Sequence, residues 1–89
     1  MAIGDLQRTV GANVRAIRTA RGYSQEAFAD VIGVHRTYAG RLERGQQNIT
    51  LQAVERLAEV MGVDVHVLLS PDLEVDVTVK VRPRDPRHL

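Results

Sequence analysis

The segment from His35 to Asn48 concentrates side chains that can donate hydrogen bonds. It holds three arginines and one acid, Glu43. A planar guanidinium can donate two parallel hydrogen bonds to a phosphate or to the O6 and N7 acceptors of guanine. The segment therefore favours binding to an anionic ligand rich in acceptors. The net charge of the chain is only +1, so an ordinary solvated surface is the alternative.

The remaining polar side chains form no recognisable catalytic or metal-binding constellation. The three histidines, His35, His66 and His88, are far apart in the sequence. There is no cysteine, which excludes a disulfide framework, a thiolate nucleophile and a thiolate zinc site. No glycine-rich phosphate loop, nucleophile elbow or zinc-type spacing is present. We therefore expect neither an enzyme nor a protein with a metal or another cofactor.

Two short helical patterns carry the hydrogen-bonding segment. The first begins at Gln25, where Ser24 can cap it, and extends to about residue 31. A turn at Gly33 follows, and the second pattern runs from residue 35 or 36 to residue 44, with Gly45 as its C-terminal glycine. A helix, a tight turn and a second, polar helix form the unit that places one helix in a DNA major groove. This pattern predicts DNA binding.

One glycine interrupts the second of these helices. Gly40 costs about 1 kcal/mol relative to alanine at such a position. A close approach to DNA is one explanation, and a tolerated weak position is the other.

Apolar stripes predict three further helices, over residues 5–20, 51–61 and 65–69. Asp5 and Thr50 are the expected N-caps of the first two, and Leu6 and Leu51 belong to their apolar stripes. Five short helices predict one all-α domain over residues 1–70, with a single core. No stretch approaches the roughly 18 apolar residues of a membrane span, and the N-terminal residues do not resemble a signal peptide.

Residues 71–89 follow a different pattern. From Leu73 to Arg82, valines alternate with polar residues, which is typical of a β-strand. A single strand cannot satisfy its own backbone, so we expect it to pair with the same strand of a second subunit. An extended tail is the alternative. Pro83 and Pro86 would end the strand and leave a flexible tail. The valines concerned are Val75, Val77, Val79 and Val81.

Several blocks of the chain resemble the Cro/repressor-type helix-turn-helix family, also called XRE. The similarity covers about residues 6–70. Two segments are especially similar to restriction–modification controller proteins, namely Arg36-Thr37-Tyr38 and Leu42-Glu43-Arg44-Gly45. The blocks are Ser24-Gln25-Glu26-x-Phe28-Ala29, Gly33-Val34, Leu42-Glu43-Arg44-Gly45 and Asn48-Ile49-Thr50-Leu51.

The resemblance implies a five-helix, lambda-repressor-like fold and a role for each matching residue. His35 could instead cap its helix, and Tyr38 could instead pack against the preceding helix. The implied base-reading residues are Arg36, Thr37 and Arg41; the DNA-backbone contacts are Gln25, His35, Tyr38, Arg44, Gln46, Gln47 and Asn48; a buried ion pair joins Arg18 and Glu43; and Val65 and Leu68 belong to a dimer surface.

The function expected from these patterns is sequence-specific regulation of transcription by a cytoplasmic, nucleoid-associated homodimer. The dimer would bind a pseudo-palindromic double-stranded operator and act mainly as a repressor. RNA polymerase is a conceivable further partner. Two alternatives are the antitoxin of a toxin–antitoxin pair, whose tail would bind the toxin protein, and a protein-interaction module that no longer binds DNA.

Overall fold

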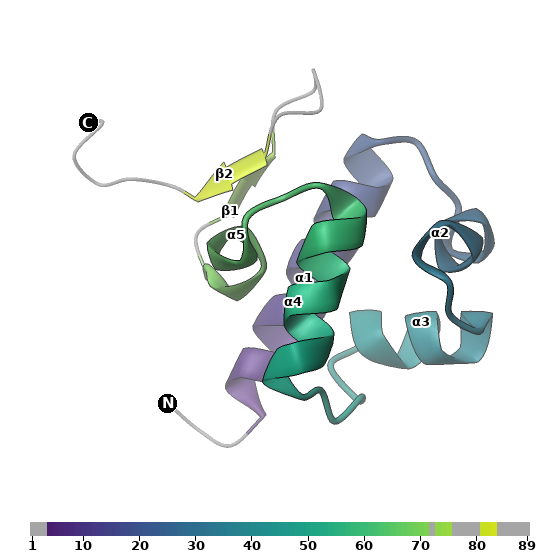
Figure 1. Ribbon diagram of the computed structural model, residues 1–89, viewed down its shortest axis with the longest axis horizontal. Coiled ribbons are helices and arrows are strands. Elements are labelled where there is room, and N and C mark those ends of the chain that lie inside the picture. The colour runs from purple at the N-terminus through teal and green to yellow at the C-terminus, as the bar shows by residue number, and fades with distance from the viewer. Residues whose placement is uncertain (1–3, 72, 76–80, 84–89) are drawn as a thin grey trace.

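The computed structural model describes residues 4–71, 73–75 and 81–83. These residues form five helices and a pair of short strands (Figure 1). The α2–α3 unit and the strands lie on opposite sides of α1 and α4 in this view. The elements are α1 (Asp5–Ala20), α2 (Gln25–Ile32), α3 (Arg36–Glu43), α4 (Leu51–Met61), α5 (Val65–Leu69), β1 (Leu73–Val75) and β2 (Val81–Pro83).

Local signals in the sequence set most of the helix boundaries. Ser24, Thr50 and Asp64 each accept a hydrogen bond from a backbone N–H in the first turn of the helix that follows. The expected cap at Asp5 is wrong. The N-cap of α1 is Gly4, in the left-handed region at φ 92°, and Asp5 is the first helical residue, ion-paired with Arg8.

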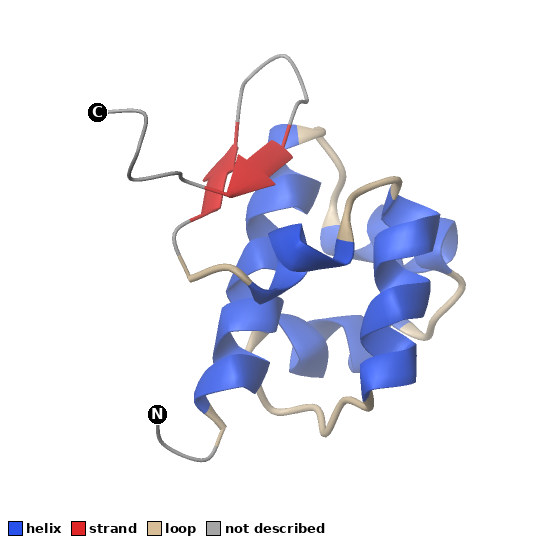
Figure 2. Cartoon of the chain, turned by 60° about the vertical axis from the view of Figure 1, so that its left-hand side comes forward, coloured by secondary structure: helices blue, strands red, loops and turns tan. Residues whose placement is uncertain are grey.

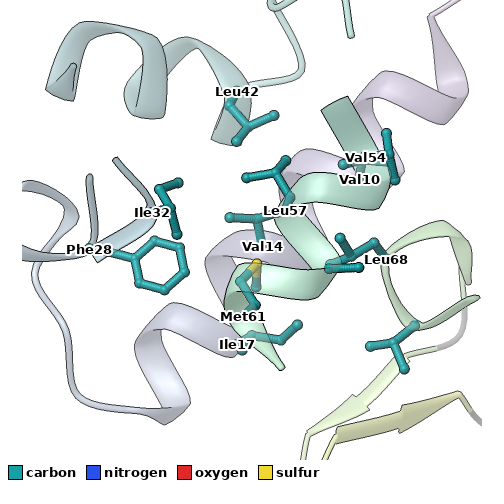
Figure 3. Packing of buried hydrophobic residues seen from close by; sticks show 12 residues of the cluster. Val10, Val14, Ile17, Phe28, Ile32, Leu42, Val54, Leu57, Met61 and Leu68 are labelled. Carbon is teal, nitrogen blue, oxygen red and sulfur yellow. The ribbon is translucent and has the colours of Figure 1, made fainter. Parts of the chain in front are cut away.

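The hydrophobic core lies between α1 and the other four helices (Figures 2 and 3). Phe28 from α2, Leu42 from α3 and Leu68 from α5 are among its fully buried side chains. The ends of two expected apolar stripes lie outside the core, because Leu6 is 40% exposed and Leu51 is 74% exposed. Both border a shallow apolar hollow instead.

α1 and α3 approach each other closely at Gly11. A Cβ placed on Gly11 would lie 2.2 Å from the carbonyl oxygen of Leu42 and 2.9 Å from that of Glu43. These carbonyls belong to the last turn of α3, where a helix has no partners of its own for its oxygens. Only a glycine lets the backbone of α1 come this near to the end of α3.

A buried asparagine joins α1 to the end of α5. Asn13 is 7% exposed. Its Nδ2 donates hydrogen bonds to the carbonyl oxygens of Val67, Leu68 and Ser70, at 3.2, 3.0 and 2.7 Å. The amide thus satisfies carbonyls at the C-terminus of a helix that is only one turn long.

An ion pair joins α1 to the last residue of α3. The Nε of Arg18 donates to Oε2 of Glu43 at 2.7 Å, and its Nη2 donates to Oε1 at 3.1 Å. The two side chains are 14% and 4% exposed. Nη1 of Arg18 also donates to the carbonyl of Tyr23 at 2.8 Å, just before α2. The ion pair expected from the family resemblance is therefore present and largely buried.

The valine-rich segment does not form one continuous strand. β1 pairs antiparallel with β2 of the same chain, with Leu73 opposite Pro83 and Val75 opposite Val81. The single strand expected from Leu73 to Arg82 is therefore wrong, because the strand partner lies within the same chain. β1 packs on α1 and β2 on α5. Val77 and Val79 lie outside the described residues.

Among the described residues, no helix combines the length and the apolar character needed to cross a membrane.

We expect Gly11→Ala to destabilise the fold, although alanine is the better helix former. The added Cβ would meet backbone atoms that cannot move alone, and such overpacking costs about 1–3 kcal/mol. Gly40→Ala is the matched control, because a Cβ there meets only the ends of the flexible Arg44 and Gln25 side chains. It should raise the free energy of unfolding by up to about 1 kcal/mol. Urea denaturation followed by circular dichroism measures both, and a Gly11→Ala protein as stable as the parent would contradict the close contact.

We expect Glu43→Leu to lower the free energy of unfolding by about 3–5 kcal/mol, because it leaves the buried guanidinium of Arg18 without its carboxylate. The double variant Arg18→Met/Glu43→Leu removes both charges and should recover most of that loss. The same denaturation experiment, run as a double-mutant cycle, tests this pair. Strictly additive effects of the two substitutions would show that the ion pair does not couple α1 to α3.

Candidate nucleic-acid interface

The turn at Gly33 sets the angle between α2 and α3. Gly33 ends α2 in the left-handed conformation, with φ 75°. Its N–H donates to the carbonyl of Asp30, and the N–H of Val34 donates to that of Ala29. These two bonds satisfy two carbonyls in the last turn of α2, and α3 begins three residues after Gly33.

His35 is the N-cap of α3. Its Nδ1 accepts a hydrogen bond from the backbone N–H of Thr37 at 3.1 Å. Of the two roles expected for His35, helix capping is the one present in the structure. Because Nδ1 accepts, the ring hydrogen of the neutral imidazole is on Nε2.

α3 buries one face and exposes the other. Ala39 and Leu42 are buried in the core, whereas Arg36, Thr37 and Arg41 are exposed. All three expected base-reading residues therefore lie at the surface of the same two-turn helix.

An open hollow of about 600 Å³ lies between the first turns of α2 and α3. It brings together Arg36 and Thr37 with two of the expected backbone contacts, Gln25 and Arg44. Arg41 does not line it. The other lining residues are Ser24, Glu26 and Gly40.

The side-chain amide of Gln25 is oriented by Glu43. Its Nε2 donates to Oε1 of Glu43 at 3.1 Å. A carboxylate can only accept, so the nitrogen of the amide must face Glu43. One amide hydrogen is thus used within the chain, and the second remains for a ligand.

Gly40 accommodates side chains of the protein itself. A Cβ at this position would lie 3.1 Å from Nη1 of Arg44 and 3.3 Å from Oε1 of Gln25. The groups that approach this glycine closely are therefore two polar groups of the hollow. Spacing along the chain does not indicate the approach of Gln25, because Gln25 and Gly40 belong to different helices.

The loop after α3 is held by hydrogen bonds between side chains. Nε of Arg44 donates to Oε1 of Gln46 at 3.1 Å, which orients the guanidinium. Nε2 of Gln7, in α1, donates to Oδ1 of Asn48 at 3.0 Å. Gln47 is half-buried. The contact of Gln7 with Asn48 spans 41 residues of sequence, so the sequence alone could not reveal it.

Tyr38 and Leu68 both face the core. Tyr38 is half-buried and packs against the core, which is the second of its two expected roles. Leu68 is fully buried, at 0% exposure, and offers no surface to a second subunit. Val65 is half-buried. Val75 and Val81 lie in β1 and β2, and only their backbone is described.

Glu26 is a further residue of the hollow that the sequence patterns did not single out. Its Oε2 lies 3.8 Å from Nη1 of Arg36, across the two helices. An acid in the first turn of a helix is common, because it interacts favourably with the helix dipole. For that reason its position in the sequence carried no signal of this pairing.

Comparison with known proteins places most of the helical unit in one family. Residues 14–68 match the family model described as Helix-turn-helix. Control protein C.SmaI of Serratia marcescens is 38% identical over 66 residues, which cover 74% of this chain and 79% of the relative.

Two solved structures share the fold at appreciable sequence identity. The restriction–modification controller protein C.AhdI of Aeromonas hydrophila is 37% identical, with a TM-score of 0.62 over 70% of this chain and 94% of that one. SinR of Bacillus subtilis, solved in complex with DNA, is 34% identical, with a TM-score of 0.60 over 68% of this chain and 98% of that one.

The match spans α2, the Gly33 turn, α3 and α4, together with the C-terminal part of α1 and nearly all of α5. The resemblance expected from the sequence blocks is thereby confirmed. The chain belongs to the Cro/repressor-type (XRE) helix-turn-helix family of DNA-binding transcriptional regulators, which includes the restriction–modification controller proteins.

Proposed function

We propose that this protein is a homodimeric, sequence-specific repressor that binds a pseudo-palindromic operator with α3 in the major groove. The observation that carries the proposal is the two-sided character of α3. One face is fixed in the core through Leu42, and the other exposes Arg36, Thr37 and Arg41. An exposed helix with donors that suit base edges, held by a rigid frame, is what direct readout in the major groove needs.

The exposed residues of α3 would divide the readout among themselves. Each arginine can donate two hydrogen bonds to guanine O6 and N7. The hydroxyl and methyl groups of Thr37 suit a phosphate or the methyl group of thymine. Arg36 lies at the first residue of α3 and Arg41 five residues later, so the two would read separate base pairs.

The residues around the ends of α3 would hold the DNA backbone. Gln25 keeps one amide hydrogen for a phosphate, next to the N-terminus of α2. The guanidinium of Arg44 is oriented by Gln46 over the same hollow. Such contacts fix the register of the protein on DNA without reading the sequence. His35, Gln47 and Asn48 complete this proposed set, and Tyr38, whose ring packs inward, is left out of it.

A two-fold dimer would give the operator its symmetry. Each subunit would place one α3, with half-sites about 34 Å apart. Val65 and the edges of the β1–β2 pair are the proposed dimer surface, since a two-stranded sheet leaves edge groups unpaired. Bound to its operator in the cytoplasm, such a dimer would exclude RNA polymerase from overlapping DNA.

We expect Arg36→Ala and Arg41→Ala to relax sequence choice, each by about 1–3 kcal/mol at one base pair of the half-site. Gln25→Ala should weaken binding to all duplexes alike, because a phosphate contact carries no sequence information. The operator is first obtained by selection from a random duplex pool. Affinities for it and for its single-base variants are then measured at fixed salt.

Arg15→Ala, on the exposed face of α1, is the control for loss of one positive charge. It should leave discrimination unchanged. If both α3 variants keep full discrimination between operator and single-base variants, α3 is not the recognition helix. Selection that enriches no sequence would contradict the proposed function as a whole.

We expect truncation after Pro71 to weaken dimerisation, because it removes both strands of the proposed dimer surface. Truncation after Pro83 is the matched control, since it keeps β1 and β2. Sedimentation equilibrium gives the dimer dissociation constant of each form. Equal constants for the chain truncated after Pro71 and the full chain would rule out a role for the strands.

A further inference from the structure

Glu26 places a negative charge where the proposed ligand is also negative. Among the seven residues that line the hollow between α2 and α3, Glu26 is the single acid. Its side chain is 72% exposed, so solvent and any bound DNA can reach it. A carboxylate at such a surface opposes the approach of phosphates. Glu26 therefore cannot serve to raise the affinity for DNA, and its position requires another explanation.

Stabilisation of α2 does not fully account for the geometry. An acid in the first turn can interact favourably with the helix N-terminus without approaching a neighbouring helix. The carboxylate of Glu26 lies toward α3, with its Oε2 3.8 Å from Nη1 of Arg36. The pair joins the first turn of one helix to the first residue of the next, so the carboxylate acts on an expected base-reading side chain.

Arg36 has two competing uses at a DNA surface. It can bind a phosphate on any sequence, or it can bind the neutral edge of a guanine. A neighbouring carboxylate repels a phosphodiester, which carries a full negative charge, more strongly than it repels the partial charges of guanine O6 and N7. Glu26 therefore weakens the first use of Arg36 more than the second.

We propose that Glu26 is a specificity-determining residue, which restrains Arg36 from phosphates and so favours its contact with guanine. The proposal rests on the proposed DNA-binding function and deepens it. It assigns to α2 a part in sequence discrimination, in addition to its contact with the DNA backbone.

The size of the effect follows from the exposure of the pair. Both side chains are about 70% exposed, at 69% and 72%, and such surface pairs are weak and screened by salt. Arg36 can therefore leave Glu26 readily when a guanine is available. We expect a change in discrimination of about two- to fivefold, the range that corresponds to surface pairs.

The test compares Glu26→Gln with Asp30→Asn. Both substitutions remove one negative charge from α2, but Asp30 does not line the hollow. Dissociation constants are measured at fixed salt for the selected operator and for a scrambled duplex of the same composition. Glu26→Gln should tighten binding to the scrambled duplex about two- to fivefold more than binding to the operator. Asp30→Asn should change both affinities by the same factor.

A second background identifies the partner of Glu26. In Arg36→Ala, the substitution Glu26→Gln should no longer change the ratio of the two affinities. If Glu26→Gln still lowers the affinity for the operator relative to the scrambled duplex in Arg36→Ala, Glu26 repels DNA in general. That result would overturn the proposal. An equal effect of Glu26→Gln and Asp30→Asn on that ratio would also overturn it. Thermal unfolding of each variant verifies that the folded state is retained.

The two levels of the proposal fail in different ways. If the unmodified protein binds no duplex above the level of an unrelated acidic protein, the proposed function itself is wrong. If it discriminates the operator and Glu26→Gln discriminates equally well, only the role of Glu26 is wrong.

Discussion

The carboxylate of Glu43 is the point on which the arrangement of the first three helices depends. It accepts hydrogen bonds from Arg18 in α1 and from Gln25 in α2, while it belongs itself to the last residue of α3. Arg18 extends the connection to the carbonyl of Tyr23 before α2. A buried carboxylate needs all such donors, because each one lost leaves charge without compensation. Glu43 thereby holds α2 and α3, which line the hollow, in a fixed relative position.

Close packing at Gly11 complements this polar connection. An isolated helix of eight residues is not stable in water, so α3 depends on its neighbours for its conformation. Gly11 lets α1 contact the backbone at one end of α3, and the cap of His35 closes the other end. α3 is held at both ends, and its outer face can be polar and exposed. The helix that carries the exposed arginines is thus held in place by contacts within the protein itself.

Features encoded within a few residues were predictable, and those created by tertiary contact were not. Ser24, Gly33 and Thr50 marked their helix ends correctly, because caps and left-handed turns depend on local chemistry. Leu51 matched the apolar period of its helix but lies at the first residue of α4, beyond the core. The β1–β2 pairing was missed because alternation indicates a strand without showing where the chain folds back. The α2–α3 unit was identified, whereas the contacts of Glu26 and Gly40 join helices and leave no trace in spacing.

The low net charge of the chain makes the local contacts at the hollow more important for the proposed DNA binding. Non-specific affinity for DNA grows with the number of phosphates that a protein neutralises. With a net charge of +1, this chain has little long-range attraction of that kind, so in the proposed function contacts with bases would supply a larger share of the binding free energy. Contacts with bases would favour the operator over other DNA only if the same arginines did not bind phosphates instead. Glu26 beside Arg36 and Glu43 beside Gln25 would then act alike, because each carboxylate restricts what the neighbouring donor can bind.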